Sequence, residues 1–221
     1  MKKCLINLVV LLFTSTFIFT SCNSDIKEYS GFPVEKDIVT IIPNQEETLS
    51  MPWPLYKGIE SGFVEFSKMF NRFGHISNDE ISSMITFGNN LINFNLSDAM
   101  KDEELLKSQL GIFISDEKEI KKTIKAMKNI DADSVKKIDD FVNGIVDKFD
   151  CLLFSVQQVC EFDNGDNWFD SYEDIFNAFV ADEDQQASIT YINKYFPAAK
   201  LISSYSEVSQ IVETETEISE K

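Results

Sequence analysis

The chain has 221 residues, with 20 basic and 37 acidic side chains and a formal net charge of −17. This charge argues against nucleic acid or anionic lipid headgroups as partners, because phosphate binding depends on Lys and Arg. It favours a solvated surface or a basic protein partner. The length suits one domain with tails, large enough to bury a core that the 19 phenylalanines would largely supply.

Residues 1–21 have the layout of a secretory signal. Lys2 and Lys3 give a basic start, and an apolar run from Leu5 to Phe19 is followed by small residues. A membrane-spanning helix needs about 20 apolar residues, and this run is shorter and interrupted by polar side chains. The pattern therefore predicts a signal peptide that is cleaved from the mature chain.

The stretch Phe19-Thr20-Ser21-Cys22 resembles the lipobox of bacterial lipoproteins. In that family an apolar residue lies three positions before the cysteine and a small residue lies directly before it. Ser21 fits this pattern, whereas Phe19 is bulkier than the usual leucine. The resemblance covers residues 1–22 and implies that Cys22 is lipidated and anchors the chain to a membrane. The alternatives are a plain signal peptide with an accidental cysteine and an uncleaved amino-terminal anchor.

Cleavage before Cys22 would leave 18 basic and 37 acidic residues, a net charge of −19. Asp25 and Glu28, soon after the cysteine, resemble the export signals of some surface lipoproteins. We therefore expect a location in the bacterial cell envelope, at the outer membrane or cell surface rather than the inner membrane.

Residues 22–54 contain four prolines and scattered charges, and are predicted to form a mostly irregular, extended tether. The β-branched stretch 37–42 can make one short strand within it.

Between residues 55 and 205, apolar residues recur at steps of three and four, which predicts helices. The expected fold is all-α: an irregular bundle of about six to eight antiparallel-packed helices around a Phe-rich core. Residues 206–221 are an acidic tail that we expect to fray. Helices are expected to begin at or just after Leu55, Ser77, Ser97, Ser115, Asp133 and Ser171, and two more are expected over 185–195 and 197 to about 205. Ser77 and Glu80 form a capping-box pattern at the second of these starts.

Two of these helices carry specific predictions about burial. The second is expected to bury Ile81, Ile85, Ile92 and Leu96. The longest is apolar nearly all round at residues 151–154, so it is expected to run through the core.

Cys151 and Cys160 are nine residues apart on that longest helix. A continuous helix would place them on opposite faces, about 13.5 Å apart along its axis. A disulfide needs Cα atoms within about 7 Å. We therefore expect both cysteines to be unpaired and at least partly buried.

No catalytic or metal-binding motif stands out. His75, the one histidine, lies near a helix boundary and cannot supply a multi-histidine zinc site. Acidic residues between 161 and 174 suggest calcium, but Gly165 and Trp168 occupy positions 3 and 6 of an EF-hand loop begun at Asp163, so that pattern fails. The preferred interpretation of this segment is a turn followed by an acidic helix start. The acidic residues concerned are Glu161, Asp163, Asp166, Asp170, Glu173 and Asp174.

Three functions remain open. The first is a lipid-anchored binding protein whose acidic helical domain holds a partner, with no enzyme activity, cofactor, metal or small-molecule ligand. The second is an immunity protein or inhibitor that neutralises a basic toxin or hydrolase. The third is a hydrolase that uses paired carboxylates, with Trp168 stacking on a sugar beside Asp166 and Asp170.

Overall fold

A computed structural model describes residues 26–28, 38–44, 47–72, 76–163 and 172–207. In this part of the chain eight helices and three strands are found. The strands are β1 (Ile26–Glu28), β2 (Ile38–Asn44) and β3 (Glu47–Pro52). The helices are α2 (Trp53–Phe70), α3 (Asn78–Ile92), α4 (Leu96–Ala99), α5 (Glu103–Gly111), α6 (Glu117–Met127), α7 (Ala132–Asp163), α8 (Tyr172–Val180) and α9 (Glu183–Tyr195).

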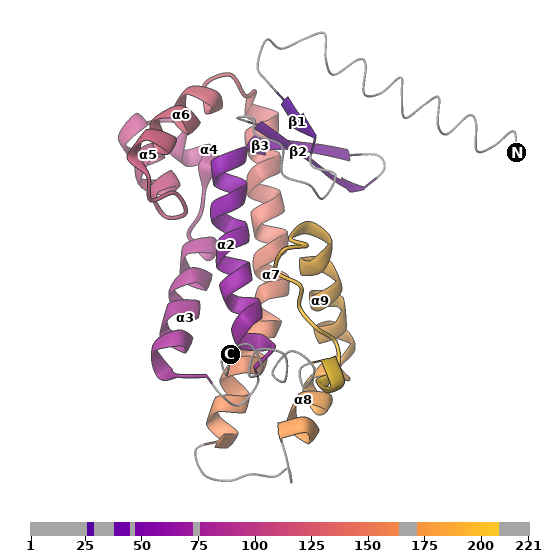
Figure 1. Cartoon of the computed structure of the whole chain (residues 1–221). Coiled ribbons are helices and arrows are strands. Elements are labelled where there is room, and N and C mark those ends of the chain that lie inside the picture. Colours follow the sequence, from indigo (N-terminus) through magenta and orange to yellow (C-terminus); the bar gives the residue numbers. More distant parts are fainter. Residues whose placement is uncertain (1–25, 29–37, 45–46, 73–75, 164–171, 208–221) are drawn as a thin grey trace, which may run out of the picture.

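The helices form an elongated bundle organised by α7 (Figure 1). This helix of 32 residues runs the length of the domain beside α2, with α3 on one side and α9 on the other. Helices α4, α5 and α6 cap one end, where the strands also lie, and α8 lies at the opposite end. The predicted helical bundle with a Phe-rich core is thereby confirmed.

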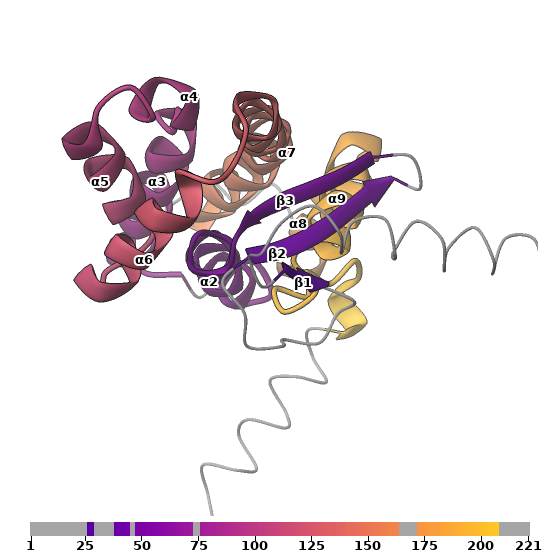
Figure 2. The same cartoon turned by 90° about the horizontal axis from the view of Figure 1, so that it is seen from above.

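A small sheet adds to this bundle. Its strand order is β1-β2-β3, with β1 parallel to β2 and β2 antiparallel to β3 (Figure 2). The strand predicted within 37–42 is present as β2. The second strand of the hairpin, β3, lies in the stretch predicted to be an irregular tether, but Leu49 and Met51 on it are buried against the helices. The folded domain therefore begins before the predicted boundary at residue 54.

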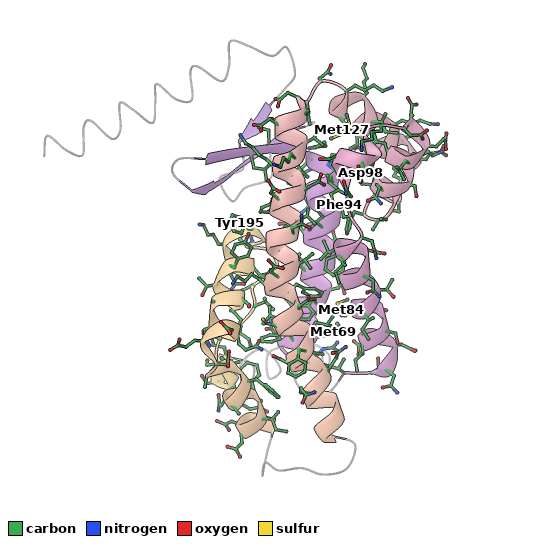
Figure 3. All side chains as sticks on the ribbon, turned by 180° about the vertical axis from the view of Figure 1, so that it is seen from behind. Met69, Met84, Phe94, Asp98, Met127 and Tyr195 are labelled. Carbon is green, nitrogen blue, oxygen red and sulfur yellow. The ribbon has the colours of Figure 1, made fainter. Side chains whose placement is uncertain are left out.

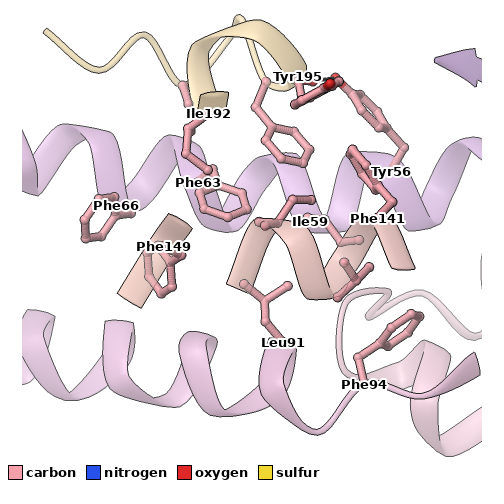
Figure 4. Close-up of a cluster of buried hydrophobic side chains, with 14 of the residues drawn as sticks. Tyr56, Ile59, Phe63, Phe66, Leu91, Phe94, Phe141, Phe149, Ile192 and Tyr195 are labelled. Carbon is pink, nitrogen blue, oxygen red and sulfur yellow. Dashed lines mark hydrogen bonds between the residues drawn. The ribbon is translucent and has the colours of Figure 1, made fainter. Parts of the chain in front are cut away.

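The core is built on edge-to-face phenylalanine contacts around Phe149 of α7 (Figure 4). Its ring centroid lies 5.3 Å from Phe63 and 4.8 Å from Phe66 of α2, and 5.6 Å from Phe87 of α3. Such pairs add to the free energy gained by burying the rings. One side chain near the middle of α7 thus joins three helices.

Helix α3 buries a different face from the one predicted. Met84, Gly88 and Leu91 are buried, whereas Ile85 and Ile92 are 38% and 51% exposed. The reason is the close approach of α3 to α7: a Cβ added to Gly88 would lie 3.2 Å from Cε1 of Phe149 and 3.5 Å from Cδ2 of Leu153. Gly88, the smallest residue of α3, faces α7. Ile85 and Ile92 therefore lie beside this helix contact and remain exposed.

The chain after α9 is not the predicted helix over 197–205. Residues 197–199 form a turn, Lys200 has a φ of 44°, and Leu201 and Ile202 are buried without regular secondary structure. Asn193 holds this segment, because its side-chain amide both donates to the carbonyl of Leu201 and accepts from its N–H, each at 2.7 Å. Pro197 therefore ends a helical stretch instead of beginning one.

Most helix starts lie within a residue or two of their predicted positions. Asp116 caps α6 in place of Ser115, and Asp131 accepts a hydrogen bond from Ser134 N–H at the start of α7. The predicted helix after Ser97 is two helices, with Asp102 capping the second. Acidic side chains suit these positions because helix N-termini carry partial positive charge.

The predicted capping box at the start of α3 is present. Ser77 Oγ accepts from the N–H of Glu80, and a Glu80 carboxylate oxygen accepts from the N–H of Ser77 at 2.8 Å. Arg72, after α2, also binds the carboxylate of Glu80. The backbone hydrogen bond from Ser77, with help from Arg72, lowers the pKa of Glu80 to about 2.

This lowered pKa predicts a pH-dependent contribution to stability. An ionised Glu80 stabilises the folded state above its ordinary pKa of 4.5, and this contribution is lost as pH falls from 4.5 towards 2. Chemical denaturation of the wild type and of Glu80→Gln should therefore show a stability difference at pH 6 that shrinks across this window. An equal difference at pH 6 and at pH 2.5 would contradict the assignment.

The core arrangement predicts unequal effects for two phenylalanines of α7. Phe149→Ala should lower the free energy of unfolding by about 3–5 kcal/mol, because it removes a fully buried ring. Phe154→Ala removes a ring that is 56% exposed and should change stability by less than about 1 kcal/mol. Urea unfolding of both variants tests this, and equal losses would show that the assigned face of α7 is wrong.

Candidate interaction surface

Several predicted site residues lie outside the described residues. These include Cys22, His75 and the acidic loop 164–171, so the structure does not place the lipid attachment site or most of the calcium candidate. Glu173 and Asp174 are described and lie in the first turn of α8. Within the described ranges, no group of three or more His, Cys, Asp or Glu side chains is arranged to hold a metal ion.

Cys151 is a free, half-buried thiol, as predicted. Helix α7 continues through both Cys151 and Cys160 without a break, which keeps the two Cα atoms on opposite sides of one helix. The side chain of Cys160 is outside the described part.

Lysines are concentrated at one end of the domain. Residues 101–137, which include α5 and α6, carry nine lysines and eight acidic residues, a net charge of +1. The described residues 172–207, which include α8 and α9, carry two lysines and six acidic residues, a net charge of −4. Because α5 and α6 lie at the opposite end from α8, the charge is polarised along the bundle (Figure 1).

Helix α7 carries an exposed stripe that combines acidic residues with one aromatic side chain. Asp147, Asp150 and Phe154 are separated by three and four residues, which places them on one face of the helix. All three are exposed, and Phe154 exposes 56% of its surface. The prediction that residues 151–154 are core nearly all round is therefore wrong for Phe154.

Exposed isoleucines lie on the neighbouring helix. Ile85 and Ile92 are three residues before and four residues after Gly88, the point at which α3 meets Leu153 of α7. They therefore share a stripe of α3 beside that contact. Figure 3 views the molecule from the side on which α7 lies in front, with α3 beside it. We call Asp150 and Phe154 of α7 with Ile85 and Ile92 of α3 the α3–α7 face. Asp147, at the other edge of the stripe, lies towards α9, where burial, with the charge of Asp147 in addition, raises the pKa of Tyr191.

The chemistry of the α3–α7 face suits protein binding. Large apolar side chains that remain exposed in a folded domain mark interaction sites when they lie together, and buried aromatic side chains dominate binding energy at protein interfaces. Carboxylates beside them attract basic partners and speed association. Sequence reasoning missed this face, although acidic residues four and seven positions before Phe154 already indicated a polar side of the helix.

No protein-family model, curated protein or solved structure matches this chain. The described residues also contain no helix with the length and apolar character needed to cross a bilayer.

Proposed function

We propose that this chain is a lipid-anchored lipoprotein of the bacterial envelope whose acidic helical domain binds a basic protein partner. The observation that carries the binding role is Phe154, a large aromatic side chain exposed beside Asp147 and Asp150. The anchor is supported by the lipobox-like sequence that ends at Cys22. The domain acts as a binding module and not as an enzyme.

The α3–α7 face would recognise its partner in two ways. Phe154 and the two isoleucines offer apolar surface, which gains roughly 25 cal/mol for each Å² removed from water. The carboxylate of Asp150, with that of Asp147 beside the face, selects a partner with Lys or Arg around an apolar pocket, because unlike charges favour the correct encounter and like charges oppose the wrong one.

A second candidate function is an immunity protein or inhibitor that neutralises a basic toxin or hydrolase. The net charge of −14 over residues 138–221 favours it, since an acidic protein associates fast with a basic target. This second candidate differs from the lipid-anchored binding protein only in the identity of the partner. The carboxylate hydrolase stays a prediction, because its candidate residues Asp166, Trp168 and Asp170 lie outside the described residues.

The anchor is tested by Cys22→Ala in the full-length chain. Without the thiol no lipid can be attached, so the protein should move from the membrane fraction to the soluble fraction. Fractionation of cells followed by immunoblotting measures this, with Cys151→Ala as the matched control that should stay in the membrane fraction. A Cys22→Ala protein that remains membrane-bound would contradict the anchor.

The binding face is tested by crosslinking in cells of the natural host. A photoreactive phenylalanine analogue at position 154 should give a discrete adduct with a basic protein, because Phe154 lies at the centre of the proposed contact. The same analogue at Leu105, which is 44% exposed on α5, should give none. Adducts of equal yield at both positions, or none at position 154, would contradict the proposal.

The contribution of Asp147 and Asp150 to binding is tested separately. Asp147→Lys combined with Asp150→Lys should reduce the yield of the adduct at position 154 by about tenfold or more, by placing like charges against the partner. Glu65→Lys combined with Glu104→Lys changes the net charge equally but alters exposed positions on α2 and α5, and should leave the yield unchanged.

A further inference from the structure

The position of β1 restricts how the domain sits on a membrane. Only three residues separate Cys22 from Ile26, the first residue of β1. Four Cα–Cα steps of about 3.8 Å span at most roughly 15 Å. If lipid is attached to Cys22, as proposed above, the sheet must lie close to the bilayer surface.

The sheet lies at the same end of the bundle as α6. Strand β1 pairs with β2 and β2 with β3, and β3 contacts both α6 and α7. In the view from above, α6 lies beside the amino-terminal end of α2 and next to the sheet (Figure 2). A short link from the lipid to β1 therefore brings α6 close to the headgroups as well.

Helix α6 presents lysines to solvent at this end. Ile120, Thr123, Ile124 and Met127 form its buried face. The opposite side carries Lys118, Lys121, Lys122 and Lys125, with Lys128 at the C-cap, and we call these five residues the α6 lysine face.

The α6 lysine face keeps a local excess of positive charge. Glu117 and Glu119 of the same helix form exposed pairs with Lys121 at 3.3 Å and Lys122 at 3.0 Å, and Glu103 of α5 pairs with Lys128 at 2.8 Å. Such exposed pairs bind weakly and are readily exchanged. Lys118 and Lys125 form no ion pair with any described residue.

From these observations we propose that the α6 lysine face rests against anionic lipid headgroups of the bilayer that holds the lipid of Cys22. The proposal depends on the anchor proposed above. The negative surface potential of an anionic bilayer attracts lysines within about one Debye length, about 8–10 Å at physiological salt. The same potential repels the acidic end formed by α8 and the first turn of α9. The polarised charge therefore orients the domain, with the acidic end away from the membrane.

This orientation modifies the expectation from net charge. A chain with a net charge of −17 should avoid anionic lipid, and the acidic end does fit that expectation. The α6 lysine face does not fit this expectation, because its lysines gather on one short helix that lies close to the lipid attachment point.

Lysine footprinting of the intact lipidated protein tests the proposal. The protein is reconstituted in phosphatidylcholine vesicles, or in vesicles containing phosphatidylglycerol, and treated with a membrane-impermeant amine-acylating reagent. Lys118, Lys121 and Lys125 should be acylated about threefold or more slowly on the phosphatidylglycerol vesicles, and high salt should remove the difference. Lys68 and Lys200, which lie at the end of the bundle away from the sheet, should react equally on both.

Two results would overturn the proposal: equal rates for the α6 lysines on both vesicles, or equal slowing of Lys68 and Lys200. Lys118→Gln combined with Lys125→Gln should reduce the protection of Lys121. The matched pair Lys68→Gln and Lys200→Gln should not.

Flotation of the same samples separates the two proposals. Wild-type protein should float with both kinds of vesicle. The Cys22→Ala variant, measured at high salt, should float with neither. A wild-type protein that does not float overturns the anchor and the orientation together. A protein that floats but shows no slowing at α6 overturns the orientation alone.

Discussion

The contact of Phe149 with α2 and α3 fixes the rotation of the helices in this bundle. Phe149 lies against Phe63 and Phe66 of α2, and Gly88 of α3 lets the two backbones approach beside it. The buried ring of Phe149 and the absence of a side chain at Gly88 together leave little freedom for α3 or α7 to rotate about its axis. The rest of the surface follows from this packing, since each helix must then direct its other side chains outward.

The proposed binding face is a consequence of that rotation. With Phe149 inward, Asp147, Asp150 and Phe154 point away from the core, and with Gly88 inward the isoleucines of α3 lie beside the helix contact. The charge, by contrast, varies along the length of the bundle. Lysines gather near the sheet, whereas α8 and the first turn of α9 carry acidic residues and no lysine, so the two ends meet different surroundings.

Much of the fold could be predicted from local sequence, because helix periods and acidic caps depend on near neighbours. The capping box at Ser77 and Glu80 shows this well. The errors arise where tertiary contacts decide. Strand β3 has only Leu49 and Met51 as buried apolar residues, too few to reveal its period. The face of α3 depends on a glycine that a hydrophobic pattern ignores, and the exposure of Phe154 depends on what α7 packs against. The anchor at Cys22 rests on the sequence alone.

Hydrogen exchange followed by mass spectrometry tests most directly whether α7 and α2 form the organising centre of the domain. Amides in the middle of α7, around Phe149, and those of α2 around Phe63 should exchange slowest and at one common rate, because both require global unfolding. Helix α8, at the end of the bundle, should exchange faster through local opening. Slower exchange in α8 than around Phe149, or clearly different rates in the middle of α2 and of α7, would contradict this account.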